Sequence, residues 1–104
     1  MATATLMDRE VHVDDEGFLT EYDEWDEELG TYMAERIGIE MTPRHWEAIR
    51  FLRSDFTEQG VTPTLRRVST SAAIPTKELF TLFPKKPAKK MAYIAGLPKP
   101  AGCV

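Results

Sequence analysis

The sequence predicts a mainly α-helical protein: a small helical bundle with an N-terminal β-hairpin, a helix-turn-helix-like pair and a flexible C-terminal arm. Three observations predict it. Apolar residues recur at helical spacing between residues 25 and 56, threonine-proline pairs mark two helix starts, and prolines and glycines interrupt the last nine residues. With 104 residues, 42% of them hydrophobic, the chain suits one modest core. We expect a single domain over residues 1–94 and a mobile arm over residues 95–104.

The first predicted element is a short β-hairpin in the stretch EVHVDDEGFLTEY. Val11 and Val13 alternate with polar residues, a turn is expected at residues 14–17, and the chain resumes with Phe18 and Leu19. A lone hairpin is marginal in water, so we expect it to lie against the helices that follow.

A first helix is predicted in the stretch DEWDEELGTYMAERIG. Trp25, Leu29, Met33 and Ile37 follow one another at intervals of four and therefore share one face of a helix. Gly38 provides the expected stop.

The second helix, in MTPRHWEAIRFLRSDFTEQG, has the clearest predicted boundaries. Thr42 suits the N-cap, Pro43 suits the first helical position, and Gly60 marks the end. The expected buried stripe comprises Trp46, Ile49, either Leu52 or Arg53, and Phe56.

Two shorter helices are predicted after it. Thr62 and Pro63 repeat the N-cap and first-turn arrangement, which predicts a third helix in VTPTLRRVSTSA. A fourth helix, in TKELFTLF, is expected to have Thr76 as its N-cap and to end before Pro84. Two short helices joined by a tight turn resemble a helix-turn-helix.

The C-terminal stretch combines a short helix with an arm. Residues 88–95 suffice for two helical turns, but Pro98 and Pro100 prevent the helix from continuing. The arm holds Cys103, the single cysteine of the chain. The stretch from Gly96 to Cys103 can extend about 25 Å, which is long enough to enter a deep pocket on another protein.

The net charge of −4 conceals an uneven distribution. Residues 1–65 carry sixteen acidic and five basic residues, whereas residues 66–104 carry eight basic residues and Glu78. This asymmetry has two interpretations: the two halves neutralise each other within the fold, or the basic half faces an anionic partner.

Cys103 is the leading candidate for chemistry. A catalytic cysteine normally has a base and an orienting group close by, whereas this one is on an arm, one residue from the end of the sequence. We therefore do not expect a self-contained enzyme. An exposed thiol on an arm suits a carrier that holds sulfur as a persulfide or joins in a mixed disulfide. The plain alternative is an incidental tail cysteine.

The remaining sequence predicts no metal or cofactor site. One cysteine excludes Cys-rich zinc and Fe–S sites as well as an internal disulfide. His12 and His45 lack the spacing of metal ligands, and the acidic run of residues 23–28 is expected to complement a helix N-terminus. No stretch has the length of a membrane span or the pattern of a secretory signal, so we expect a cytoplasmic protein.

The helix pair also allows a DNA-binding hypothesis. Arg66, Arg67 and the lysines of the basic half could contact phosphates. Against this, the second helix of the pair is short and has only Lys77 as a base, which leaves few side chains for reading base edges. DNA binding stays open as a minority alternative.

The sequence PAKKMAYIAGLPKPAGCV, with LFPKKP before it, resembles the terminal signature of the DsrC/TusE family, which includes sulfite reductase gamma-subunit-like proteins and a sulfur-relay protein for tRNA thiolation. Upstream, DDEGFL, EEL, IGIE, TPRHWEAIRFLR and the P-x-x-R of Pro63 to Arg66 follow in family order. The resemblance implies a helical domain with an N-terminal hairpin and a mobile arm. It also implies that Cys103 carries sulfur. We expect no cofactor.

Two departures limit what the resemblance implies. DsrC-type members have a second arm cysteine eleven residues before the terminal one, where this sequence has Ala92. An internal disulfide or a trisulfide between two arm cysteines is therefore excluded, which favours a TusE-like, one-cysteine relay. The segment between Arg66 and Leu82 is also shorter than we expect for typical members.

Our leading hypothesis is a sulfur carrier in a relay pathway. Donor and acceptor proteins, either TusBCD- or DsrEFH-like or sulfite-reductase-like, would exchange sulfane sulfur with Cys103. We expect a monomer that can form a Cys103-linked dimer under oxidation. The alternatives are a sulfur- or redox-responsive DNA-binding regulator that uses Arg66, and a structural subunit of a sulfite-reductase-like complex.

The other arm residues have expected supporting roles. Gly96 and Gly102 would bend the arm, and Pro98 and Pro100 would stiffen it and so reduce the entropy lost on insertion into a partner. Lys99 would attract the anionic persulfide or assist docking.

Overall fold

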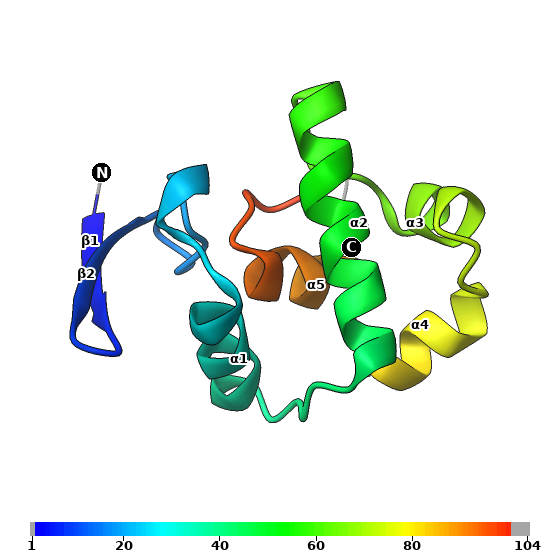
Figure 1. Ribbon diagram of the computed structural model, residues 1–104, viewed down its shortest axis with the longest axis horizontal. Helices are drawn as coiled ribbons and strands as arrows, with labels where there is room; N and C mark the ends of the chain where they lie inside the picture. The colour runs from blue at the N-terminus through cyan, green and yellow to red at the C-terminus, as the bar shows by residue number, and fades with distance from the viewer. Residues whose placement is uncertain (1, 101–104) are drawn as a thin grey trace.

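The computed structural model describes residues 2–100 and has the predicted fold class, a hairpin followed by a helical bundle (Figure 1). The elements are strands β1 (Ala2–Leu6) and β2 (Arg9–Val13), the 3-10 turn η1 (Tyr22–Glu24), and helices α1 (Glu27–Arg36), α2 (Pro43–Gln59), α3 (Leu65–Ser71), α4 (Thr76–Leu82) and α5 (Pro87–Ala95). Within the described residues no helix is long and apolar enough to cross a membrane. Nor does this part of the chain gather three side chains suited to a metal ion.

The hairpin lies closer to the N-terminus than predicted. β1 pairs with β2 through a two-residue turn in which Met7 and Asp8 both have positive φ, the geometry of the favoured type I′ turn. The predicted turn at residues 14–17 also forms, but the strand expected after it is reduced to one bridge between Val13 and Leu19. The two residues after this turn are both buried, so they do not alternate between two faces as strand residues do.

Helix α1 begins later than its apolar spacing predicted. Asp26 caps the helix by accepting a hydrogen bond from the N–H of Leu29, so Trp25 precedes the helix instead of belonging to it. Leu29 and Met33 are buried on one face, as predicted, and the helix ends before Gly38.

The predicted boundaries of α2 are confirmed. Thr42 caps the helix in a box with His45, the predicted proline is its first residue, and Gly60 ends it with φ +75°. Leu52 and Arg53 were alternatives for one position of the buried stripe, and Leu52 is the one in the core. Arg53 is half-buried and serves another purpose, described below.

The predicted pair of short helices is present, but their N-caps differ from the prediction. Thr64 caps α3 in place of Thr62, because its Oγ1 accepts a hydrogen bond from the N–H of Arg67. Thr76 is the first residue of α4, and Pro75 occupies the cap position. Thr62 is therefore available for a different contact.

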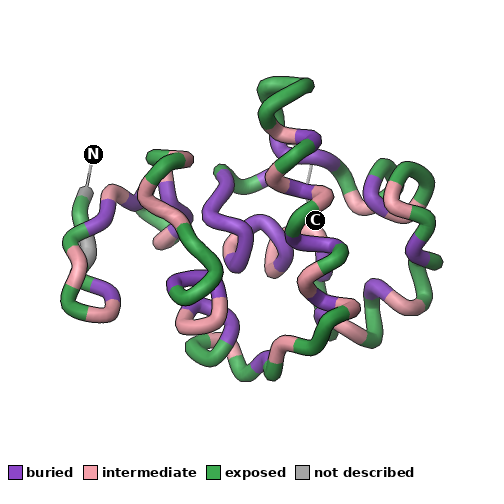
Figure 2. Tube along the Cα trace, viewed as in Figure 1, coloured by how far each residue is buried: buried purple, intermediate pink, exposed green. Residues whose placement is uncertain are grey.

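Helix α5 is at the centre of the core, between α1 and α2 (Figure 1). One cluster of buried side chains joins α2, α3, α4 and α5, and a second joins the hairpin to α1. Trp25 and Tyr93 pack against both clusters. Figure 2 shows that the buried trace follows α5 and continues into the segment after it. The fully buried residues of α5 are Met91, Ala92, Ile94 and Ala95.

The packed domain extends past residue 94, where we expected a mobile arm to begin. Leu97 has no exposed surface, and Gly96 and Pro100 are also buried. Leu97 supplies an apolar anchor that holds residues 95–100 against the domain. The rest of the expected arm, residues 101–104, lies outside the described residues.

An ion pair joins the hairpin to η1. His12 Nδ1 lies 2.8 Å from Glu24 Oε2, and the backbone N–H of His12 donates to Oε1 of the same carboxylate. The side-chain hydrogen bond to Glu24 raises the pKa of His12 above its ordinary value of 6.5. The hydrogen bond from the backbone N–H of His12 lowers the pKa of Glu24 below its ordinary value of 4.5.

We therefore expect this pair to stabilise the fold most fully between about pH 4.5 and 6.5. The raised pKa of His12 adds stability that is complete below the unfolded value and is lost as the pH rises through the folded value. The lowered pKa of Glu24 adds stability that is lost as the pH falls. Thermal unfolding checks this: the difference in Tm between the protein and His12→Gln should shrink from about pH 5.5 to about pH 8.5. A difference that stays constant would contradict the assignment.

Candidate functional site

The candidate site begins at the arm root, which we define as residues 96–100. Helix α5 ends because Gly96 adopts φ +69°, and the N–H of Leu97 then reaches back to the carbonyl of Ala92. This is a Schellman-type helix end, which glycine forms without strain. A Cβ on Gly96 would lie 2.5 Å from Cδ1 of Trp25, so the position has no space for a side chain. The chain therefore turns at Gly96 in a fixed direction.

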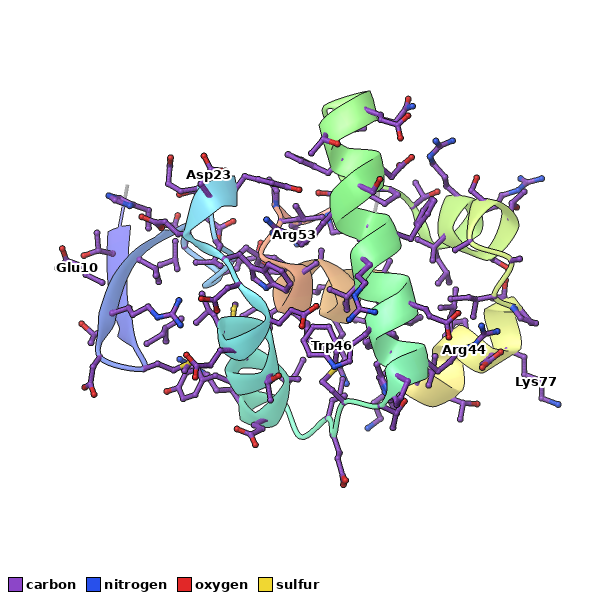
Figure 3. The ribbon with its side chains drawn as sticks, in the orientation of Figure 1. Glu10, Asp23, Arg44, Trp46, Arg53 and Lys77 are labelled. Carbon is purple, nitrogen blue, oxygen red and sulfur yellow. The ribbon has the colours of Figure 1, made fainter. Side chains whose placement is uncertain are left out.

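An arginine clamp, formed by Arg53 with Tyr22 and Trp25, holds the end of α5 directly before the arm root. The guanidinium carbon of Arg53 lies 3.9 Å from the centroid of the Tyr22 ring and 4.1 Å from that of the Trp25 ring. Arg53 Nη1 donates to the carbonyl of Ala95 over 2.7 Å, and Trp25 Nε1 donates to the carbonyl of Ile94 over 2.7 Å. Figure 3 labels Arg53 in the space between α2 and η1.

The clamp satisfies two carbonyls that a helix end leaves without partners inside the helix. It also places a positive charge at the negative end of the helix dipole. Sequence reasoning missed this role, because it considered Arg53 only as an alternative to Leu52. The available signal was an arginine next to a buried stripe in a chain rich in aromatic residues.

Two further side chains fix the rest of the arm root. Thr62 is buried, and its Oγ1 donates to the carbonyl of Pro98 over 2.7 Å. Lys99 Nζ lies 3.2 Å from Glu16 Oε2, and this contact lowers the pKa of Glu16 below its ordinary value. Exposed ion pairs contribute little, so Thr62 and the buried Leu97 provide the firmer hold.

Replacing Thr62 by valine is expected to lower the free energy of unfolding by about 0.5–1.5 kcal/mol, because the substitution keeps the shape and removes one buried hydrogen-bond donor. Urea unfolding followed by circular dichroism measures the change. Thr81→Val is the matched control, since Thr81 is exposed on α4 and donates only within its own helix. Equal losses in the two variants would show that the Thr62 contact with Pro98 does not hold the arm root.

Four of the predicted site residues lie in the arm root, where they are already neighbours in the sequence: Gly96, Pro98, Lys99 and Pro100. Arg66 is exposed on α3, and no hydrogen bond that holds the arm root within the described residues involves it. Gly102 and Cys103 lie outside the described residues. Covalent geometry alone limits the Cα of Cys103 to about 11 Å from that of Pro100.

Comparison with known proteins decides the family. A sequence model of the family described as DsrC like protein matches residues 5–104, which include the terminal cysteine. The chain belongs to the DsrC-like family. This DsrC-like protein is 40% identical over 103 residues to sulfurtransferase TusE of Escherichia coli (strain K12), with 92% of this chain and 94% of the relative covered. It is 38% identical over 105 residues to the dissimilatory-type sulfite reductase subunit gamma of Nitratidesulfovibrio vulgaris, with 100% of both chains covered.

Solved structures of DsrC proteins have the same fold. The NMR structure of Allochromatium vinosum DsrC matches with a TM-score of 0.85 and 34% identity, covering 98% of this chain and 97% of the other. The oxidized gamma-subunit (DsrC) from Archaeoglobus fulgidus matches with a TM-score of 0.80 and 35% identity, covering 99% and 100%. The resemblance inferred from the terminal signature is thus confirmed over nearly the whole chain.

Proposed function

We propose that this DsrC-like protein is a sulfur carrier in a relay pathway and that Cys103 holds the sulfane sulfur as a persulfide. The observation that carries the proposal is its similarity, over at least 92% of the chain, to proteins named sulfurtransferase TusE and sulfite reductase subunit gamma. The chain offers one thiol for this chemistry.

Loading is an exchange between a thiolate and a persulfide. The thiolate of Cys103 attacks the outer sulfur of the donor's persulfide, the S–S bond of the donor breaks, and the donor leaves as a thiolate. Cys103 is then a persulfide. No oxidant is consumed, because the sulfane sulfur moves from the donor to Cys103 without a change of oxidation state. Delivery to an acceptor thiolate is the same exchange in the opposite sense.

The arm root sets how far the thiol reaches. With Leu97 buried and Pro98 held by Thr62, covalent geometry lets the chain after Pro100 carry Cys103 at most about 11 Å from it. The reach of about 25 Å expected from Gly96 requires release of these contacts. A partner with a shallow site needs only the short tether, whereas a partner with a deep site must also displace Leu97.

The single cysteine favours a TusE-like relay over sulfite reduction through two arm cysteines. Ala92, where DsrC-type members have the second cysteine, is fully buried in α5. The partners we propose are sulfur-donor and sulfur-acceptor proteins of the TusBCD or DsrEFH kind, and the docked structural subunit remains the second candidate because of the similarity to a sulfite reductase subunit.

The structure gives little support to DNA binding. Arg67 is engaged by Asp55, whose carboxylate lies 2.8 and 2.6 Å from its Nε and Nη2. Arg44 is likewise occupied, because it donates two hydrogen bonds to the carboxylate of Glu78 on α4. None of the relatives named above is described as a DNA-binding protein.

Mass spectrometry tests the carrier function. The reduced protein is incubated with an inorganic polysulfide, its intact mass is recorded, and its peptides are mapped. We expect a gain of one sulfur atom on the peptide that contains Cys103, with the original mass restored by dithiothreitol. A thiol that stays unmodified while it can still be alkylated would overturn the proposal.

A further inference from the structure

A groove lined by lysines adjoins the arm root. This lysine groove has a volume of about 530 Å³ and is formed by the N-terminal end of α5, the turn before Phe18 and the end of α1. Phe18, Ile37 and Tyr93 provide its apolar surface, and its charged surface consists of Glu16 with Lys85, Lys86, Lys89 and Lys90.

The positive charge of the lysine groove is only partly neutralised within the described residues. Lys89 Nζ lies 3.5 Å from Glu16 Oε1, but the same carboxylate is shared with Lys99. Lys90 donates to the carbonyl of Pro84, and neither Lys85 nor Lys86 forms an ion pair with a described residue. The groove therefore has four lysines and one carboxylate, that of Glu16, which also binds Lys99.

The backbone restricts where two of these lysines point. Lys85 and Lys86 have φ values of +60° and +51°, in the left-handed region that non-glycine residues seldom adopt. Pro84 precedes the pair, and Pro87 follows it as the first residue of α5. Such a conformation persists only where the surrounding structure imposes it, so both side chains leave the chain in defined directions.

The lysine groove is connected to the arm root through Glu16. Glu16 belongs to the groove and also binds Lys99 in the arm root. The Cα of Cys103 lies no more than about 15 Å along the chain from that of Lys99. A partner bound in the groove would therefore lie beside the arm root, from which the chain continues to Cys103.

We propose that the lysine groove docks an acidic segment of a protein that exchanges sulfur with Cys103, an inference that rests on the carrier function proposed above. An apolar side chain of the segment packs against Phe18, Ile37 and Tyr93, and its flanking carboxylates pair with the lysines. Charge complementarity of this kind guides the encounter and fixes the orientation of the partner.

The groove suits a short acidic segment better than a nucleic acid. No arginine lines it, and much of its surface is apolar. The chain as a whole has a net charge of −4, and two further acids, Asp14 and Asp15, precede Glu16. A long polyanion would extend over these acids and be repelled by them. A short segment would interact mainly with the lysines, because charges are screened beyond about 8–10 Å at physiological salt.

Nuclear magnetic resonance of the full chain tests the proposal. The probes are a synthetic peptide with four glutamates around one tryptophan, the same peptide with alanine in place of tryptophan, and a single-stranded RNA of equal charge. We expect the tryptophan peptide to shift the signals of groove residues and to bind more tightly than both other probes. Shifts elsewhere on the surface, equal affinity of the two peptides, or tighter binding of the RNA would overturn it.

A charge-reversal pair gives the matched control. Lys86→Glu should weaken binding of the tryptophan peptide by about tenfold or more, because it removes one attraction and adds one repulsion. Lys77→Glu makes the same change of charge on α4, where Lys77 is exposed and points away from the body of the protein (Figure 3), and should leave the affinity unchanged. Equal effects of the two variants would mean that only net charge matters and would contradict a specific site.

The failure of docking can be distinguished from the failure of the carrier function. Loading by inorganic polysulfide needs no docked protein, so Lys86→Glu should still gain one sulfur atom per chain when the reaction is complete, even though the reversed charge changes the rate. Normal loading without peptide binding would overturn the docking site alone. Absence of loading in the unmodified protein would overturn the carrier function, and with it the sulfur-exchanging partner.

Discussion

Replacing Cys103 by serine is expected to abolish sulfur loading and transfer completely. Cys103 is the single thiol of the chain, and a serine hydroxyl cannot accept sulfane sulfur. Because the role we propose for Cys103 is chemical and not structural, we expect Tm to remain within about 1 °C of the unmodified protein. Intact mass after treatment with polysulfide and a thermal unfolding curve measure the two properties.

Ala101→Ser is the matched control for this substitution. It introduces the same hydroxyl group two residues earlier and keeps the thiol, so loading should remain complete. Residual loading of Cys103→Ser would mean that sulfur is held elsewhere. A large drop in its Tm would instead indicate that the cysteine has a structural role.

Gly96→Ala is expected to cost the fold about 2–4 kcal/mol, the largest loss of stability that we predict for a single methyl group. The alanine would have to adopt φ +69°, and its Cβ would lie 2.5 Å from Cδ1 of Trp25. Trp25 cannot move away easily, because its Nε1 donates to the carbonyl of Ile94 and its ring stacks on Arg53. Urea unfolding measures the loss.

Gly60→Ala separates the two causes of this loss. Gly60 also has a positive φ, +75°, but no atom lies within 4 Å of the position of its Cβ. Gly60→Ala should therefore lower the free energy of unfolding only by the cost of a positive φ for alanine, about 1–2 kcal/mol. Equal losses at Gly60 and Gly96 would show that contact with Trp25 contributes nothing. A double-mutant cycle of Gly96→Ala with Trp25→Ala, which removes the Cδ1 and Cγ atoms nearest the new Cβ, should show coupling only if the ring is the obstacle.

Gly96→Ala should also separate the loading of sulfur onto Cys103 from its delivery to an acceptor. Displacement of the arm root changes the direction in which the tether leaves the domain, whereas the thiol itself is untouched. We therefore expect Gly96→Ala to accept sulfur from polysulfide normally and to deliver it more slowly to a protein acceptor, because delivery depends on orientation. Transfer from a preloaded sample in a single turnover, below the unfolding temperature of the variant, gives this rate.

Local signals in the sequence predicted the helices well. Thr42 and Gly60 mark the two ends of α2 as expected, because a cap depends on residues within one turn of it. Where two local signals competed, the prediction failed by a few residues. Asp26 as a cap excludes Trp25 from α1, and Thr64 replaces Thr62 at the start of α3.

Contacts between distant parts of the sequence were beyond prediction from a single chain. Thr62 binds Pro98, Arg53 binds the end of α5, and Glu16 binds Lys99, and the partners in each pair are at least 36 positions apart in the sequence. No periodicity or cap motif indicates such pairs. For this reason the arm was expected to be free from residue 95, whereas its first residues are packed. The chemistry assigned to Cys103 stays a prediction, which rests on one cysteine and its surrounding motif.

The release of sulfane sulfur by cyanide tests the central claim most directly. Cyanide attacks the outer sulfur of a persulfide, which yields thiocyanate and restores the thiolate. After loading with polysulfide and removal of the excess, we predict one thiocyanate per chain from the unmodified protein and none from Cys103→Ser. A yield near zero from the unmodified protein, or equal yields from the two proteins, would contradict the assignment of Cys103 as the sulfur carrier.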